Sequence, residues 1–358
     1  MAVQKRANQA DIAERLGVSV STVSRALANE IGISDAVRRD VQRMARSLGY
    51  KSKHITGPAG GDKRAVALVP LGNATSGLSG FYFGIVEGMR QQAAEAGMML
   101  DVRLVNDQMV TLDMIRKQID QADAGGLLLA GIDAWDELAA WCAQEDIPAV
   151  LVNGSDPRMR LSSVSPANFY GAYLATQRLL DAGHRRILHY THRYRPTILQ
   201  RQRGFEAAIA ATPGAQGIIV NTADRDSRGL LADLLTGKHD VTALFCWNDI
   251  AAVEMLESIY APDSPLPDGF SIIGFDDLPL AGMATPRLST IRVDREAIGR
   301  GAVRLLSQHM EGEGAVQQLE IGVSMVEGET VSAIASHWMC RHLLAKSDRI
   351  LRHRIATS

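Results

Sequence analysis

The stretch DIAERLGVSVSTVSRALAN, residues 11–29, decides how the first part of the chain folds. Apolar residues at helical spacing up to Leu16 predict a short helix, and Gly17 can adopt the left-handed conformation that often ends one. Ser19 can then cap a second helix. The expected inward face of this second helix consists of Val20, Val23, Ala26 and Leu27. Two short helices joined by a three- or four-residue turn with glycine predict a helix-turn-helix unit.

The second helix carries unusual polar residues. Surface helices mostly use Glu and Lys, because hydroxyl side chains compete for backbone hydrogen bonds. Here the outward positions are Ser21, Thr22, Ser24 and Arg25. Short hydroxyl groups let a helix approach DNA closely and donate to phosphates, and an arginine can reach a base edge, most naturally guanine. We therefore predict that this helix recognises DNA.

The charge distribution agrees with a DNA-binding head. Residues 1–54 contain ten Lys or Arg against five Asp or Glu, whereas the rest of the chain contains 28 against 35. A basic head on an acidic body indicates that the head binds a polyanion, although a solvated helical surface explains the charge alone equally well. Ser34 can cap a third helix that ends at Gly49. Residues 55–64 have the composition of a linker.

The remainder of the chain alternates between strand and helix patterns. Buried-strand patterns occur at 65–69, 98–105, 125–131 and 147–153, and again at 185–190, 217–221, 241–247 and 269–275. Such alternation predicts parallel sheets that are covered by helices on both faces. The expected fold is a small all-α helix-turn-helix domain followed by a two-lobed α/β domain with two doubly wound parallel sheets. Ligands of such sheets bind beyond the carboxyl ends of the strands, where Asn, Asp, Arg and Thr gather in this sequence.

Composition and motifs exclude several other classes. The three cysteines, Cys142, Cys246 and Cys340, are too scattered for a disulfide framework, and no apolar run approaches the length of a membrane span. The amino terminus lacks the apolar segment of a secretory signal, so we expect a cytoplasmic protein without membrane contact. We find no GxGxxG after a strand, no Walker loop, no GxSxG and no metal-binding set. We therefore expect no enzyme activity, no cofactor and no metal.

At this point the chain resembles the LacI family of bacterial transcription regulators over about residues 8–335. Besides the helix-turn-helix pattern, the resemblance is carried by ISDAVRRDVQRMARSLGY (33–50), LLDAGHRRI (179–187), RQRGF (201–205), ND (248–249), GFDD (274–277) and PRLSTI (286–291). It implies a repressor that binds operator DNA as a dimer and whose DNA affinity a small molecule controls. It also implies that the body is similar to type I periplasmic sugar-binding proteins.

The resemblance implies a domain plan and residue roles. The expected domains are a DNA-binding domain at 1–54, a linker at 55–64, an effector and dimerisation domain at 65–336 and an extension at 337–358. The first lobe would comprise about 65–160 and 292–320, and the second about 161–291 and 321–336. The implied DNA contacts are Val20, Ser21 and Arg25 to bases, Ser19, Thr22 and Ser24 to phosphates, together with Ser34 and Tyr50. The implied effector contacts are Phe81, Tyr82, Asn153, Arg195, Thr197, Arg201, Asn248 and Asp276.

The effector class is less defined by the sequence. Arginines at or after strand ends (Arg158, Arg160, Arg193, Arg195 and Arg201) favour a sugar acid or sugar phosphate over a neutral sugar, unless some of them pair with nearby carboxylates or face solvent. A purine or nucleoside is the alternative, because Arg195, Thr197 and Arg201 keep the spacing of a purine-responsive member. Asp224 stands where such members supply an aromatic side chain, which weakens that alternative. A transport-type sugar-binding protein is a more remote alternative.

The segments on either side of the body depart from the family pattern. Family members follow the third helix with a Pro-Asn pair and a short hinge helix, whereas this chain has KSKHITGPAGG at residues 51–61. Its glycines and proline oppose a helix, so we expect a weak or absent hinge helix. The extension at 337–358 has an apolar spacing that favours an amphipathic helix. That spacing is too short to distinguish a dimer from a tetramer.

Overall fold

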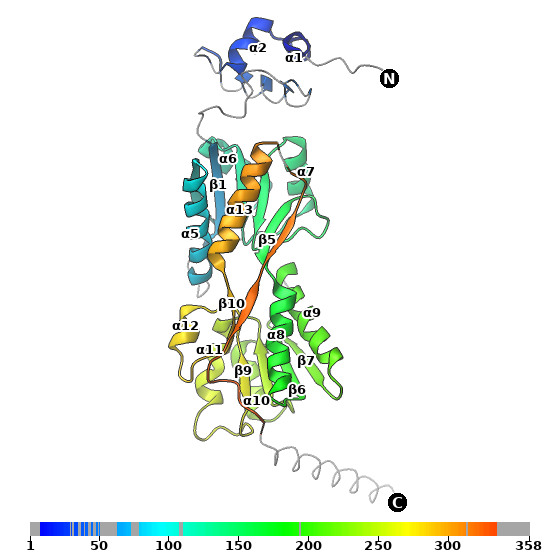
Figure 1. Cartoon of the computed structure of the whole chain (residues 1–358), viewed down its shortest axis with the longest axis vertical. Helices are drawn as coiled ribbons and strands as arrows, with labels where there is room; N and C mark the ends of the chain where they lie inside the picture. The colour runs from blue at the N-terminus through cyan, green and yellow to red at the C-terminus, as the bar shows by residue number, and fades with distance from the viewer. Residues whose placement is uncertain are drawn as a thin grey trace, which may run out of the picture.

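The computed structural model describes residues 8–334 except for 29, 31, 35–36, 39, 42–43, 46–47, 49, 51–62, 73–78, 107–109, 193–194 and 313. The predicted hinge departure and the predicted carboxyl-terminal extension therefore lie outside the described residues. The described parts are a helical head and a body made of two lobes stacked end to end (Figure 1). None of the helices described is both long enough and apolar enough to span a membrane.

The head contains the two predicted helices, α1 (Gln9–Leu16) and α2 (Val20–Leu27). Asn8 and Asp11 form a reciprocal capping box at the start of α1, and Gly17 ends that helix with a φ of 64°. The buried face of α2 packs against α1 and the third helical segment; its residues are Val23, Ala26 and Leu27. Val20 was expected on this face but is 46% exposed, because it is the first residue of α2 and the head core begins one turn later.

The third helix of the head is described in part. Helical residues there include Val37, Val41 and Ala45, and the last two are fully buried against the first two helices. The Ser34 hydroxyl accepts a hydrogen bond from the backbone N–H of Val37 at 3.4 Å, as expected of a residue that caps a helix.

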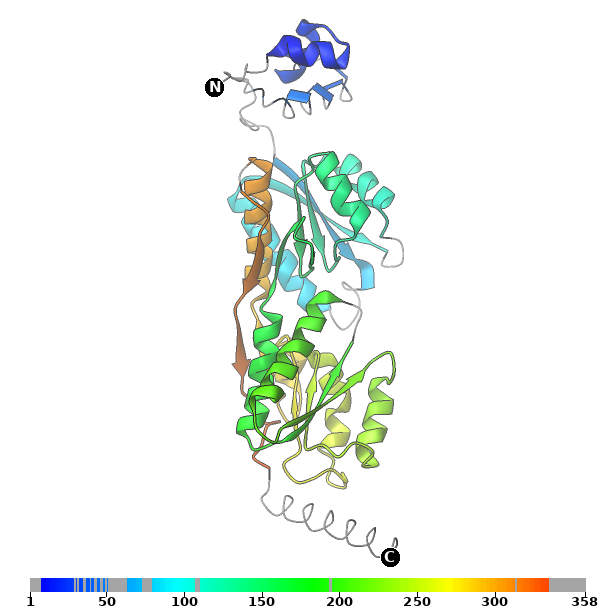
Figure 2. The ribbon, with the colours of Figure 1, turned by 90° about the vertical axis from the view of Figure 1, so that its right-hand side faces the viewer.

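The first lobe is built on a six-stranded parallel sheet (Figure 2). Its strands, in spatial order, are β11 (Gln318–Ile321), β5 (Ser162–Pro166), β4 (Ala149–Val152), β3 (Gly126–Ala130), β1 (Lys63–Pro70) and β2 (Met98–Val105). Alternate residues of β1 pack on α5 (Ser79–Glu95) and α13 (Arg295–Met310) on one face, and on α6 (Leu112–Ala122) and α7 (Asp136–Gln144) on the other. This is the doubly wound arrangement that the sequence predicts.

The second lobe repeats the plan with four parallel strands. Their spatial order is β7 (Gln216–Asn221), β6 (Arg186–Thr191), β8 (Ala243–Cys246) and β9 (Ser271–Ile273). One face of the sheet packs on α8 (Asn168–Asp181) and α9 (Pro196–Ala211), and the other on α10 (Ser227–Leu235), α11 (Asp249–Ile259) and the short α12 (Pro279–Met283).

Three chain crossings connect the lobes. The first runs from β5 into α8, and the other two involve the antiparallel pair β10 (Thr290–Val293) and β12 (Val323–Val326). The expected start of the second lobe at residue 161 is displaced, because β5 hydrogen-bonds to β4 within the first sheet. The serine-rich β5 lacks the run of large apolar residues by which the sequence reveals the other strands, so no strand was predicted there.

A close helix contact positions the residues of the second lobe that face the first. A Cβ atom at Gly204 of α9 would lie 2.1 Å from the carbonyl oxygen of Phe169 in α8, so only glycine allows the two helices to approach this closely. The contact brings Asn168, the first residue of α8, beside Arg201 of α9.

Candidate functional site

The centre of the candidate site in the second lobe is Arg201, whose side chain is 4% exposed. It donates a hydrogen bond to Asp276 at 3.2 Å and another to the side-chain oxygen of Asn168 at 2.8 Å. It also donates to the backbone carbonyl of Trp247 and lies 3.6 Å above the centre of the Phe275 ring. Three separate segments of the chain therefore hold one guanidinium group in a fixed orientation.

Burial acts on both members of the Arg201–Asp276 pair. It raises the pKa of Asp276 to about 6, although the neighbouring Arg201 acts in the opposite direction. It also lowers the pKa of Arg201, which Asp276 opposes. A buried pair that water no longer solvates is a weak source of stability but is typical of functional sites. We therefore regard the pair as the strongest candidate for ligand recognition in the described chain.

Arg195, immediately before α9, reaches from the second lobe to the first. Its Nε lies 3.0 Å from Oδ2 of Asp133, and its other nitrogens donate to the Tyr82 hydroxyl and the Asn153 carbonyl. The Asn153 amide donates to the same Tyr82 hydroxyl at 3.1 Å. Burial would lower the pKa of Arg195, but Tyr82 and the Asp133 carboxylate together raise it above its usual value. We call these residues the interlobe site, together with Thr197, Arg201 and Asp276.

Two of the sequence-predicted effector residues lie in structural positions. Phe81 is buried in the first-lobe core, with its ring edge against Tyr82 at a centroid distance of 5.3 Å. Asn248 caps α11, since its side-chain oxygen accepts from the N–H of Ala251 at 2.9 Å. The others occur in the two contact sets around Arg195 and Arg201 or, in the case of Thr197, on the first turn of α9 between them.

Sequence reasoning missed Asp133, Asn168, Thr191 and Asn221. Asp133 and Thr191 lie in the polar runs that follow or end strands, so strand-end polarity was a general signal for them. That signal could not single them out, because the partner of Asp133 lies in the other lobe and the neighbour of Thr191 depends on the register of β6 and β7. Thr191, Thr197 and Asn221 are all at least 96% buried, and each carries a polar atom without a hydrogen-bond partner.

Those of the arginines favouring an anionic effector that the structure describes have carboxylate partners. Arg158 and Arg160 pair with Asp136 within the first lobe, and Arg160 also pairs with the fully buried Asp156 at 3.0 Å. Arg195 and Arg201 pair with Asp133 and Asp276. Arg193 lies outside the described residues. Positive and negative side chains in the described interlobe site are therefore balanced.

The outer surface of α2 presents a small hydroxyl cluster. The Ser19 hydroxyl lies 2.8 Å from both the Ser21 and the Thr22 hydroxyls and accepts from the N–H of Thr22 at 3.0 Å. Arg25 is exposed and pairs with Glu30 at 3.2 Å. Ser24 is also exposed, whereas Tyr50 is half-buried against the head core. The exposed groups can donate to phosphates and bases without rearrangement of the helix.

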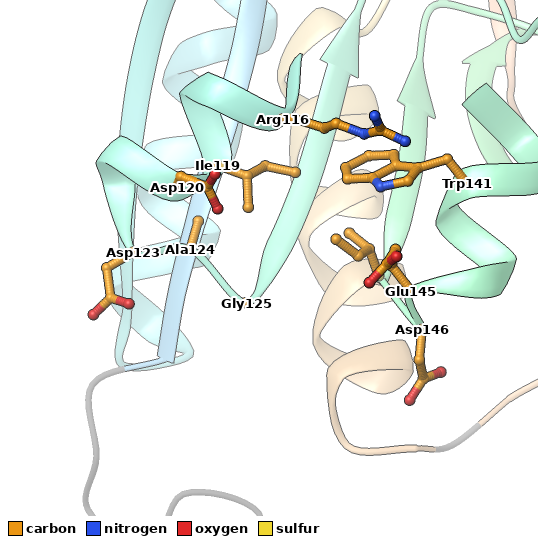
Figure 3. A pocket seen from close by; sticks show the side chains of 10 residues that line it. Arg116, Ile119, Asp120, Asp123, Ala124, Gly125, Trp141, Glu145 and Asp146 are labelled. Atoms are coloured by element: carbon orange, nitrogen blue, oxygen red, sulfur yellow. The ribbon is translucent and has the colours of Figure 1, made fainter. Parts of the chain in front are cut away.

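A groove of about 500 Å³ lies elsewhere in the first lobe, between the carboxyl ends of α6 and α7 (Figure 3). Its carboxylates are Asp120, Asp123, Glu145 and Asp146, and Arg116 stacks over its Trp141 floor. None of the predicted effector residues lines it. Among the residues that the structure describes, no three His, Cys, Asp or Glu side chains gather in a way that could hold a metal ion.

A helix-turn-helix head joined to a two-lobed α/β body defines the architecture of a DNA-binding transcription regulator. Comparisons agree: residues 10–53 match the family described as bacterial regulatory proteins, lacI family, and residues 176–331 match the periplasmic binding protein-like domain. The HTH-type transcriptional repressor CytR of Escherichia coli (strain K12) is 30% identical over 323 residues, which is 86% of this chain and 91% of CytR. The chain belongs to the LacI family and is a DNA-binding transcriptional repressor; its relatives are regulators, not enzymes.

Two solved structures show the same fold. The transcriptional regulator CelR in complex with cellobiose has a TM-score of 0.66 and 24% identity, covering 91% of this chain and 100% of CelR. The lac repressor dimer bound to operator and the anti-inducer ONPF has a TM-score of 0.63 and 22% identity, covering 92% of this chain and 100% of its own.

Proposed function

We propose that a neutral, polyhydroxylated small molecule binds at the interlobe site and controls the affinity of this repressor for its operator. The observation that carries the proposal is the charge balance of the site, in which Asp133 and Asp276 neutralise Arg195 and Arg201. A carboxylate or phosphate would have to displace these pairs and leave a buried carboxylate uncompensated. A sugar hydroxyl can instead donate to Asp276 and accept from Arg201 while the pair stays intact.

The comparison with CelR supports a neutral sugar, because the ligand named in that structure is cellobiose. Asp224, which stands at the position of the aromatic residue in purine-responsive members, is exposed. We therefore favour a neutral sugar over the sugar acids, sugar phosphates and purines that the sequence left open.

We further propose that the head binds operator DNA through α2 and that the protein acts as a dimer. Exposed apolar side chains occur on the edge strand β2, on α5 and on α12, as Met99, Leu104, Phe83 and Met283. The start of α5 lies against α12, since a Cβ atom at Gly80 would lie 3.9 Å from Pro279. Exposed apolar side chains on both lobes suit burial against a second copy of the chain. Ligand binding between the lobes would change their angle and, through the dimer, the spacing of the heads.

The DNA-binding part of the proposal is tested by Arg25→Ala, with Arg15→Ala as the matched control. Arg15 is an exposed arginine in the last turn of α1. We expect Arg25→Ala to lose about 1–3 kcal/mol of preference for a selected operator over random DNA, because a base contact is removed. Arg15→Ala should keep that preference. Fluorescence anisotropy with the two DNAs at fixed salt measures the difference, and equal preference in both variants would contradict the role of Arg25.

A further inference from the structure

Two polar groups of the second lobe, Thr191 and Asn221, lie side by side at the carboxyl end of the sheet. They are the last residues of β6 and β7 and face each other directly in the parallel register. Neighbouring strands are about 4.8 Å apart, and paired residues project to the same face. Thr191 is 0% exposed and Asn221 is 2% exposed. Yet Oγ1 of Thr191 and Nδ2 of Asn221 have no hydrogen-bond partner.

The hydrogen-bonding role of the Asn221 NH₂ group is fixed by the bond that its side-chain oxygen makes. Its Oδ1 accepts a hydrogen bond from the backbone N–H of Ala223 at 3.0 Å. The NH₂ group is therefore the half without a partner, and it can only donate. The Thr191 hydroxyl is free to donate or to accept. Buried polar groups almost always have partners, so an adjacent pair without them indicates a place where a ligand supplies the missing bonds.

Among the described residues, the neighbour of this pair on the same strand face is an uncharged histidine. His189 lies two residues before Thr191 on the same face of β6, stacked on Phe245 at a centroid distance of 4.5 Å. Its Nδ1 bonds to the Phe245 carbonyl, which makes Nε2 an acceptor, and Nε2 has no partner. Burial lowers the pKa of His189 to about 3, so the ring is neutral at physiological pH. The hydroxyl of Thr197, on the first turn of α9, also has no partner.

We propose that Thr191 and Asn221 form a hydroxyl-binding subsite that reads one hydroxyl group of the neutral effector. The inference rests on the proposed function and extends the site beyond Arg201 and Asp276. A hydroxyl oxygen accepts from the Asn221 amide while its proton is donated to Thr191. A carboxylate or phosphate oxygen could accept from both groups, but it would bring a charge beside the neutral His189. The subsite therefore selects for an uncharged polyol.

The test uses the intact protein and Thr191→Val, which replaces the hydroxyl with a methyl group of similar size. The control is Thr176→Val, because Thr176 is also fully buried in this lobe but donates to the Ala172 carbonyl at 2.7 Å. Calorimetric titration with D-ribose, D-glucose and cellobiose, and with their monodeoxy analogues, identifies the sugar that the wild type binds. We expect Thr191→Val to lower the affinity for that sugar by about ten-fold or more. The variant should bind one deoxy analogue with the same affinity as the parent sugar.

Asn221→Asp is the second variant. It keeps the oxygen that accepts from the N–H of Ala223 but replaces the NH₂ donor with a second oxygen. This variant should also lower the affinity for the sugar by about ten-fold or more. Ligand-free Thr191→Val should melt at or above the wild-type temperature, whereas Thr176→Val should melt lower with unchanged sugar affinity. If the wild type binds a sugar and Thr191→Val and Asn221→Asp bind it equally well, the subsite is overturned and the proposed function stands. If no neutral sugar binds the wild type, both proposals are overturned.

Discussion

The two lobes of the body share one layered plan but differ in what they bury. The polar residues that the first lobe buries among the described residues are Asn153, Asp156, Ser162 and Ser163. The second lobe buries a much larger set, which includes His184, His189, Thr191, Thr197, Arg201, Asn221, Asp249 and Asp276. The first lobe therefore resembles an ordinary apolar core with a few polar contacts at its edge. The second lobe holds a polar network whose groups are expensive to remove from water.

This difference indicates a division of labour. The second lobe, which buries ionisable groups, gives up stability for recognition. The apolar first lobe supplies a rigid surface against which the second lobe can close. Arg195 joins the two, since it is anchored in the second lobe and contacts Tyr82, Asp133 and Asn153 in the first. Three predictions test the comparison.

The largest expected effect is the loss of one buried charge in the second lobe. Arg201→Ala leaves Asp276 buried without its partner and should lower the free energy of unfolding by about 3–5 kcal/mol. The first-lobe control is Arg103→Ala, whose side chain is 23% exposed and pairs with Asp101; it should lose about 1 kcal/mol or less. Urea unfolding measures both. Equal losses would remove the distinction between the lobes, whereas recovery of stability in the Arg201→Met, Asp276→Leu double variant would sharpen it.

A smaller effect concerns the acid sensitivity of the second lobe. Burial lowers the pKa of His189 to about 3 from an unfolded value of 6.5. Between these two pH values the unfolded chain binds a proton at His189 and the folded lobe does not. The resulting stability is complete above pH 6.5 and is lost as the pH falls towards 3. Asp276 acts in the opposite sense, because burial raises its pKa to about 6. As the pH falls below 6, the folded state binds a proton there more readily than the unfolded state, which adds to the free energy of unfolding.

The measurement is the change in unfolding free energy between pH 7 and pH 5 for the wild type and for His189→Phe. The variant cannot take up the proton in either state, so it should lose about 2 kcal/mol less than the wild type over this interval. Asp276→Asn should lose more than the wild type, because it lacks the compensating group. Identical pH slopes in all three proteins would mean that these buried groups do not distinguish the second lobe.

The smallest effect is on the contact between the lobes. Asp133→Asn removes the ion pair with Arg195. The side chains of both residues are about one-fifth exposed, so the loss should weaken lobe closure by about 1 kcal/mol or less. We expect the radius of gyration from small-angle X-ray scattering to increase slightly. The control, Asp136→Asn, breaks pairs with Arg158 and Arg160 inside the first lobe and should leave the scattering curve unchanged. A curve for Asp133→Asn identical to the wild type would show that this pair does not hold the lobes.

The sequence predicted the architecture because local patterns carry it. Helix caps such as Asn8 and Ser19, and apolar runs such as 125–131, act within a few residues and can be read directly. Strand β5 was missed because its burial comes from its neighbours in the sheet and not from its own apolar residues. Val20 was placed inward because periodicity does not reveal where the head core stops.

The candidate site was only partly predictable for a related reason. Arg195, Arg201 and Asp276 could be identified, but their partners Asp133 and Asn168 are 62 and 33 residues away from the arginines they contact. Charge balance depends on such long-range pairing, so counting arginines along the chain overstated the positive charge of the site. Thr191 and Asn221 are ordinary strand-end residues in the sequence, and only the register of β6 and β7 brings them together.

The most direct test of the central claim is a calorimetric titration of the intact protein with matched ligands. Each neutral sugar in the series would be paired with its acid and its phosphate, under identical buffer and salt. Because the arginines of the interlobe site are neutralised by Asp133 and Asp276, we predict that a neutral sugar binds at least about ten-fold more tightly than its charged partners. Binding confined to an acid or a phosphate would contradict the account and show that one of these arginines leaves its carboxylate for the ligand.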